Sequence, residues 1–159
     1  MTHLLQHPFT RKSVSSDEML ALFRIFAKEF NIYLIDMLEI GLKHQSVMRV
    51  MEGNTAEFIG SGDMAVLATP AMIALMENAA MLAVALKIEE SETTVGSMIS
   101  TTHLKPSKVG NTVSAIAELT AIEGRKLTFK IEAYDGETLI GEGEHVRYIV
   151  NREKFLSKL

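Results

Sequence analysis

The longest apolar stretch of the chain, VLATPAMIALMENAAMLAVALKI at 66–88, predicts a helix that is hydrophobic on nearly every side. Thr69-Pro70 marks its beginning, because threonine can cap a helix and proline suits the first helical turn. Glu77 and Asn78 interrupt the apolar sequence near its centre. A helix of this kind needs burial on every side, so we expect it at the centre of a domain.

After this helix the period changes to the two-residue alternation of β-strands. Strands are predicted at 93–106, 112–122, 126–134 and 137–150, and one more at 44–53 precedes the helix. Asp135-Gly136 is a typical hairpin signal. Consecutive strands with short links predict an antiparallel meander. Two of the strands place alternate apolar residues on one face: Val113, Ala115, Ala117, Leu119 and Ala121, then Leu127, Phe129, Ile131 and Ala133.

The order of these elements predicts an α+β domain in which a curved antiparallel sheet wraps around the long helix. Ahead of it, residues 1–14 indicate a loose arm. Ser15 and Glu18 then form a capping box before an amphipathic helix at about 16–30. We therefore divide the chain into an N-terminal arm with its extra helix, residues 1–41, and a second domain, residues 42–159.

Composition narrows the classes of function. The 159 residues suffice for one domain, and 47% hydrophobic with 23% charged residues is ordinary for a globular protein. A net charge of -4 without a long basic run argues against nucleic acid or an anionic membrane as the partner. The absence of cysteine excludes disulfides, zinc–thiolate sites and cysteine nucleophiles. No stretch has the pattern of a membrane span or a signal peptide, so we expect a cytoplasmic protein.

Three polar residues are candidates for chemistry: Thr69 at the beginning of the helix, Glu77 within it and His103 in a predicted strand. Each also has a purely structural interpretation, as a helix cap, a carboxylate on a solvent-facing stripe and an ordinary strand histidine. A carboxylate in so apolar a helix either finds a partner or changes its protonation. Together the three would supply a hydroxyl, a base and a proton shuttle.

Three segments, ATPAMIALMENAAM, TTVGSMISTTHLKPSKVG and GEHVRYIV, resemble the hot-dog-fold thioesterases, in particular the branch similar to fluoroacetyl-CoA thioesterase. The resemblance covers roughly residues 45–150. It implies a hot-dog fold and an acyl-CoA thioesterase, a hydrolase that converts an acyl-CoA thioester to free acid and CoA. By this resemblance Thr69, Glu77 and His103 are the catalytic group, because they match the family's spacing.

The resemblance also implies a substrate site. Gly96 matches a family glycine close to the acyl thioester, and Arg147 matches an arginine near the active site. The fluoroacetyl-specific members carry aromatic residues in the lid before the threonine, whereas Gly60–Thr69 contains none. We therefore expect a short- or medium-chain acyl-CoA, with no metal ion and no cofactor beyond the CoA of the substrate. The remaining candidates are Met64, Val66 and Leu67 for the acyl end, and Lys105, Lys108 and Arg125 for the CoA phosphates.

Helix geometry separates Thr69 from Glu77, since eight residues at about 1.5 Å each span about 12 Å. We therefore expect a homodimer, or a tetramer formed by two such dimers, with a site built from two subunits, as the resemblance also implies. The residue types are compatible both with a covalent route and with direct attack by water on the thioester. The backbone amides of Ala71 and Met72 are candidate oxyanion donors. Two alternatives are a non-catalytic acyl-CoA-binding or regulatory module and a hydratase or dehydratase of the same fold.

Overall fold

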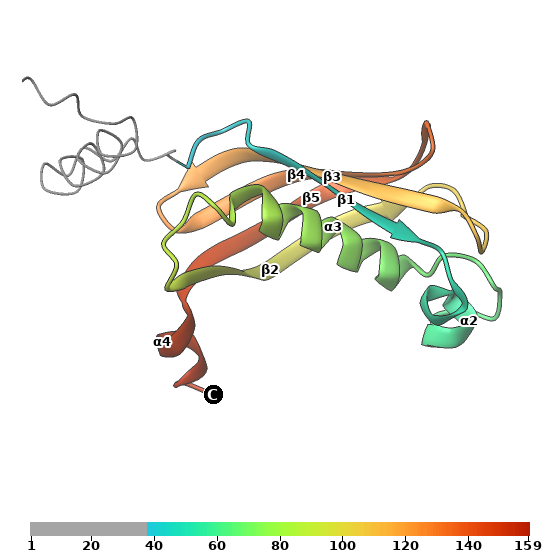
Figure 1. Cartoon of the computed structure of the whole chain (residues 1–159), viewed down its shortest axis with the longest axis horizontal. Helices are drawn as coiled ribbons and strands as arrows, with labels where there is room; N and C mark the ends of the chain where they lie inside the picture. The colour runs from blue at the N-terminus through green and yellow to red at the C-terminus, as the bar shows by residue number, and fades with distance from the viewer. Residues whose placement is uncertain (1–37) are drawn as a thin grey trace, which may run out of the picture. The chain divides into compact units, whose positions relative to one another are not determined.

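The described part of the chain is an antiparallel sheet with one long helix across its face (Figure 1). The computed structural model describes residues 38–159, and the helix predicted at 16–30 lies outside the described residues. In chain order the elements are β1 (Lys43–Arg49), the short 3-10 helix η1 (Glu52–Asn54), α2 (Ala56–Ile59), α3 (Thr69–Val84), β2 (Glu92–His103), β3 (Thr112–Glu123), β4 (Lys126–Asp135), β5 (Thr138–Asn151) and α4 (Arg152–Leu156).

The five strands of residues 38–159 lie in the order β1-β3-β4-β5-β2, and every neighbouring pair is antiparallel. The predicted meander is correct for β3, β4 and β5 but wrong for β2, which pairs with β5 at the sheet edge. The link at 104–111 is not a tight turn. It runs past the beginning of α3, where the amide of Leu67 donates to Ser107 O at 2.9 Å. This longer path lets the chain cross from one edge of the sheet towards the other.

Alternation along β3 and β4 places the predicted face in the core. Val113 to Leu119 and Leu127 to Ala133 bury every second residue, and Phe129 is fully buried. The alternation in β3 ends at a shift in register between Leu119 and Ala121, so Ala121 is only half-buried. An extra residue changes which face the following side chains occupy. The hydrophobic pattern therefore identified the core face of both strands up to this irregularity.

Helix α3 begins at Thr69, with Ala68 as the residue before the first helical turn. Thr69 is thus inside the helix, and the interpretation of Thr69 as its cap is wrong. Pro70 lies in the first turn, as predicted, where a missing N–H costs no helical hydrogen bond. The helix contacts all five strands of the sheet.

The sheet covers one side of α3 only. The buried side is rich in alanine, which allows the helix to lie close to the strands: Ala71, Met72, Leu75, Met76, Ala79, Ala80, Ala83 and Val84. Ala74, Asn78 and Leu82 are exposed on the opposite side, so the expectation of burial on every side is wrong for a single chain. Asn78 accepts a hydrogen bond from the hydroxyl of Ser46 on β1 at 2.7 Å, which gives this polar residue a partner.

Within residues 38–159, no helix combines the length and the hydrophobicity needed to span a membrane.

Candidate active site

Thr69 and His103 meet where the beginning of α3 lies beside the end of β2. Thr69 Oγ1 is 2.8 Å from His103 Nδ1, although the two residues are 34 positions apart. This is the distance expected between a nucleophilic hydroxyl and its base. The amide of Met72 donates to Ala68 O at 3.0 Å, so it is occupied within the helix and the expectation that it is an oxyanion donor is wrong.

The surroundings of His103 keep its imidazole neutral. Burial lowers the pKa of His103 below its ordinary value, and the backbone of Lys105 opposes part of this shift. A neutral imidazole can accept a proton, whereas an imidazolium cannot. His103 Nε2 is buried and has no hydrogen-bond partner among residues 38–159. The second ring nitrogen is thus not committed to another side chain of the described chain.

A cleft of about 320 Å³ opens beside the Thr69–His103 pair. Val66 and Leu67, two of the residues predicted for the acyl end, line it together with Lys105. Neither Met64 nor Lys108 is among the residues that line this cleft, and both side chains are exposed. The backbone of Lys108 nevertheless pairs with that of Val66, which places the residue at the rim.

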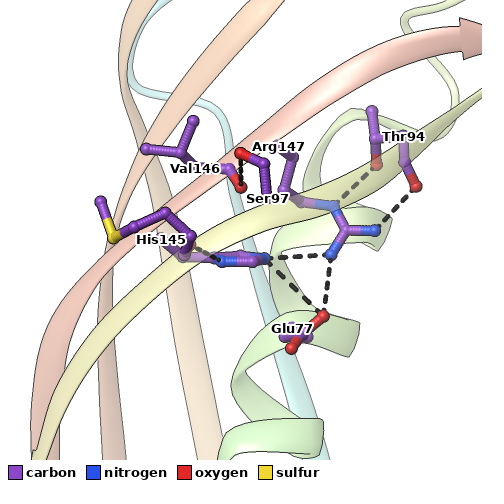
Figure 2. Close-up of polar contacts among 7 residues, drawn as sticks. Glu77, Thr94, Ser97, His145, Val146 and Arg147 are labelled. Atoms are coloured by element: carbon purple, nitrogen blue, oxygen red, sulfur yellow. Dashed lines mark hydrogen bonds and ion pairs between the residues drawn. The ribbon is translucent and has the colours of Figure 1, made fainter.

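Glu77 belongs to a second cluster, near the centre of α3 (Figure 2). Its Oε2 lies 3.4 Å from Nη1 of Arg147 and 4.0 Å from Nε2 of His145. Arg147 and His145 are two positions apart on β5, so both side chains point to the same face of the sheet. The carboxylate thus faces a guanidinium and an imidazole, and 41% of its side chain is exposed.

The guanidinium of Arg147 is held on three sides. Nε donates to Thr94 Oγ1 and Nη2 donates to Thr94 O, both at 2.8 Å, while Nη1 lies 3.0 Å from His145 Nε2. Arg147 is only 6% exposed. Burial lowers the pKa of Arg147, and Glu77 opposes that shift by favouring the charged form. These contacts fix the position of the positive charge opposite Glu77.

Gly96 faces this second cluster. It is paired with Arg147 across β2 and β5, next to a register shift between Gly96 and Met98. A Cβ at this position would lie 3.0 Å from His145 Cε1 and 3.1 Å from Glu77 Oε2. A glycine is therefore the residue that lets His145 and Glu77 approach the strand.

The structure thus divides the predicted site residues between two clusters in each chain. Thr69, His103 and Val66 lie at the cleft, whereas Glu77, Gly96 and Arg147 lie together farther along α3. Sequence reasoning missed His145 and Thr94. The signal for His145 was its spacing, since it lies two positions before Arg147 on the same strand face. Thr94 gave no comparable signal, because its bonds to Arg147 depend on the pairing of β2 with β5.

Among the His, Asp and Glu residues of 38–159, no group of three or more is arranged to bind a metal ion.

Comparison with known proteins agrees with this architecture. Residues 50–153 match the fluoroacetyl-CoA-specific thioesterase family. The chain is 40% identical over 94 residues to the fluoroacetyl-CoA thioesterase of Streptantibioticus cattleyicolor, which covers 59% of this chain and 68% of that enzyme. A solved structure of a fluoroacetyl-CoA thioesterase has a TM-score of 0.72 and 32% identity, over 77% of this chain and 96% of that one. A hot-dog-like protein of Thermanaerovibrio acidaminovorans shares the fold, with a TM-score of 0.69 and 19% identity over 76% and 90% of the two chains.

Fold and comparisons together define a hot-dog-fold thioesterase, a hydrolase of acyl-CoA thioesters. The match to the family begins directly after β1 and ends in the first turn of α4. The chain belongs to the fluoroacetyl-CoA-specific thioesterase family. The predictions of a hot-dog fold and of a thioesterase are confirmed.

Proposed function

We propose that this enzyme hydrolyses short- or medium-chain acyl-CoA thioesters at a composite site, with Thr69 and His103 from one subunit and Glu77 from the other. The observation that carries the proposal is the 2.8 Å contact between Thr69 Oγ1 and His103 Nδ1 at the cleft. A hydroxyl within hydrogen-bond distance of a neutral imidazole is the arrangement that activates an oxygen nucleophile.

The chemistry divides into acyl transfer and hydrolysis. As Thr69 Oγ1 forms a bond to the acyl carbon, its proton passes to His103 and the carbon–sulfur bond breaks. His103 then returns the proton to the CoA thiolate. In the second step Glu77 of the partner subunit takes a proton from water, which attacks the acyl-threonine ester. The bond between the acyl carbon and Thr69 Oγ1 breaks, the proton on Glu77 passes to Thr69 Oγ1, and the acid is released. In the competing route, His103 or Glu77 activates water for direct attack on the thioester and no acyl-enzyme forms.

The size of the cleft favours a small acyl group. Its volume of about 320 Å³ lies near the lower end of the range of about 300–1,000 Å³ typical of small-molecule sites. Val66, Leu67 and Leu104 give it apolar walls. The cation that lines it is Lys105, so we assign Lys105 to a CoA phosphate ahead of Lys108 and Arg125. Arg125 instead forms an ion pair with Glu92 and bonds to Ile149 O.

The need for a second subunit follows from the separation of the two clusters. Thr69 and Glu77 are about 12 Å apart along α3, and Gly96 and His103 are about 23 Å apart along β2. In the sheet of residues 38–159, β2 is an edge strand with β5 as its neighbour. Antiparallel pairing of β2 with its copy, about a two-fold axis near Ile99 and Ser100, would place Gly96 opposite His103 of the partner subunit. Such a dimer brings Glu77 to the Thr69–His103 pair.

A thiol-release assay over acetyl-, fluoroacetyl-, butyryl-, hexanoyl- and decanoyl-CoA tests the proposed substrate class. The chain contains no cysteine, so a thiol reagent reports free CoA without a signal from the protein. We expect the highest kcat/KM among the C2 to C6 substrates and a loss of about 100-fold or more in Glu77→Gln and in His103→Ala. Near-normal rates in both variants would contradict the assigned site, and a marked preference for decanoyl-CoA would contradict the assigned substrate.

Mixing inactive variants tests the composite site. If each site takes Glu77 from one subunit and His103 from the other, a hybrid of Glu77→Gln with His103→Ala contains one intact site. Random exchange of equal amounts should therefore restore about a quarter of wild-type activity. No recovery, with hybrid dimers demonstrated by native mass spectrometry, would place both residues in one subunit. Mass spectrometry of an acid-quenched reaction distinguishes the two routes, since only the covalent route acylates Thr69.

A further inference from the structure

The hydrogen bonds of His145 define its protonation state. Nδ1 lies 2.7 Å from Met98 O, and a carbonyl oxygen can only accept, so Nδ1 carries a hydrogen. Nε2 lies 3.0 Å from Nη1 of Arg147, and a guanidinium nitrogen can only donate. Nε2 must therefore present its lone pair. The geometry fixes a neutral imidazole in the Nδ1–H tautomer, in a side chain that is 1% exposed.

This lone pair is one of the groups that position Arg147. Thr94 fixes Nε and Nη2, and His145 fixes Nη1, the nitrogen that also faces Glu77 Oε2 at 3.4 Å. Arg147 is buried, so it acts on the reaction through Glu77 rather than by contact with the substrate. The order of contacts runs from Met98 O through His145 and Arg147 to the carboxylate.

We propose that neutral His145 is a positioning residue of this thioesterase: it orients Arg147, which holds the catalytic carboxylate of Glu77, and protonation of His145 displaces that carboxylate. The proposal rests on the assignment of Glu77 to catalysis above. A proton on Nε2 would point at an N–H of Arg147 and repel it. The same proton would attract Glu77 Oε2, which lies 4.0 Å from Nε2. The carboxylate would have to move by about 1 Å to reach hydrogen-bond distance. A displacement of this size at a catalytic group can cost about 100-fold in rate.

The groups around His145 favour such a response. The charged side chains that face it are Glu77 from α3 and Arg147 from β5 itself. Its cross-strand neighbours are the apolar Ile99 on β2 and Phe129 on β4. Burial lowers the pKa of His145 and Arg147 adds to this effect, while Met98 and Glu77 oppose it. The imidazole is therefore neutral at neutral pH and takes up a proton at a lower pH than an ordinary histidine does.

Two substitutions separate positioning from simple packing. Gln at position 145 keeps an oxygen that can accept from Arg147 but does not titrate, whereas Leu removes the acceptor. At pH 7.5 we expect His145→Leu to lose about 10- to 100-fold in kcat with KM changed by less than about threefold. His145→Gln should keep kcat within about threefold of wild type. Equal kcat in wild type and folded His145→Leu would overturn the proposal.

The acidic limb of the pH–rate profile supplies a readout that a packing role would not change. In wild type, protonation of His145 should add to the loss of kcat that protonation of His103 causes, so log kcat should fall more steeply with decreasing pH than it does in His145→Gln. His145→Gln should reduce the slope of log kcat against pH by up to one, and the control His44→Gln, on β1, should leave the slope unchanged. An unchanged slope in His145→Gln contradicts the inference even if His145→Leu fails to fold.

Nitrogen-15 NMR of the imidazoles tests the tautomer directly, and a protonated Nε2 on His145 at pH 7.5 would also contradict the inference. The variants also distinguish failure of the positioning role of His145 from failure of the proposed function. Full loss of rate in Glu77→Gln combined with normal His145 variants would refute the positioning role alone. Normal rates in Glu77→Gln would refute the catalytic assignment itself.

Discussion

Replacement of Gly96 by alanine tests the geometry of the Glu77 cluster with the smallest possible change. The added Cβ would lie 3.0 Å from His145 Cε1 and 3.1 Å from Glu77 Oε2, closer than ordinary van der Waals contact. Gly96 does not have a positive φ, so the backbone accepts alanine and the cost comes from these contacts. Both side chains must move by a few tenths of an ångström, and His145 is buried among β2, β4 and β5.

The size of the effect follows from these distances. Overpacking by one methyl group in a well-packed region costs about 1–3 kcal/mol, and the half-exposed Glu77 can yield more easily than His145, which favours the lower value. Movement of Glu77 away from Arg147 should reduce kcat by about 10- to 100-fold. We thus expect Gly96→Ala to be folded at 25 °C, with a slightly lower free energy of unfolding and a reduced kcat.

Two measurements and one control decide the outcome. Urea unfolding followed by circular dichroism gives the stability, and thiol release gives kcat with the best acyl-CoA substrate. Gly53→Ala is the matched control, because a Cβ there meets no atom within 4 Å and the glycine has no positive φ. If Gly96→Ala equals Gly53→Ala in both stability and rate, the close approach of His145 and Glu77 to the strand is irrelevant and the reasoning fails.

Three further predictions concern stability and charge. Phe129→Ala should lower the free energy of unfolding in urea by about 3–5 kcal/mol because Phe129 is fully buried, whereas the exposed Phe58→Ala should cost less than about 0.5 kcal/mol. Burial lowers the pKa of His103 and His145 in the folded chain, so the unfolded chain takes up protons first, and stability should fall as the pH drops below the unfolded value of 6.5. The fall between pH 7.5 and 5.5 should shrink in His103→Gln/His145→Gln, and an equal fall would contradict the burial of these imidazoles. Arg147→Lys should lower the free energy of unfolding by about 1–3 kcal/mol, because an ammonium cannot reproduce the bonds to Thr94, while Lys130→Ala, at an exposed position, should have a clearly smaller effect; similar losses in both would be inconsistent with the buried network.

The sequence by itself determined the elements and the chemical groups. Alternation identified the buried faces of β3 and β4, and the apolar stretch with Thr69-Pro70 identified α3 to within a few residues. These features are local, because side-chain period and proline geometry depend on near neighbours in the chain. The resemblance supplied Thr69, Glu77 and His103 as a group, and the family comparison confirmed the class of enzyme.

The tertiary structure decided which groups meet. Pairing of β2 with β5, rather than with β3, places Gly96 beside Arg147 and brings Thr94 to the guanidinium. No local period encodes this choice, since strand pairing depends on the path of the link at 104–111 past the beginning of α3.

The same distinction applies to the first residue of the helix. Residue type alone favoured Thr69 as a cap, whereas the close approach of β2 to α3 places its hydroxyl within hydrogen-bond distance of His103. Glu77 was recognisable from sequence as a costly carboxylate in an apolar helix. Its partners were not, because His145 and Arg147 lie about 70 residues away and reach it only through the folded sheet.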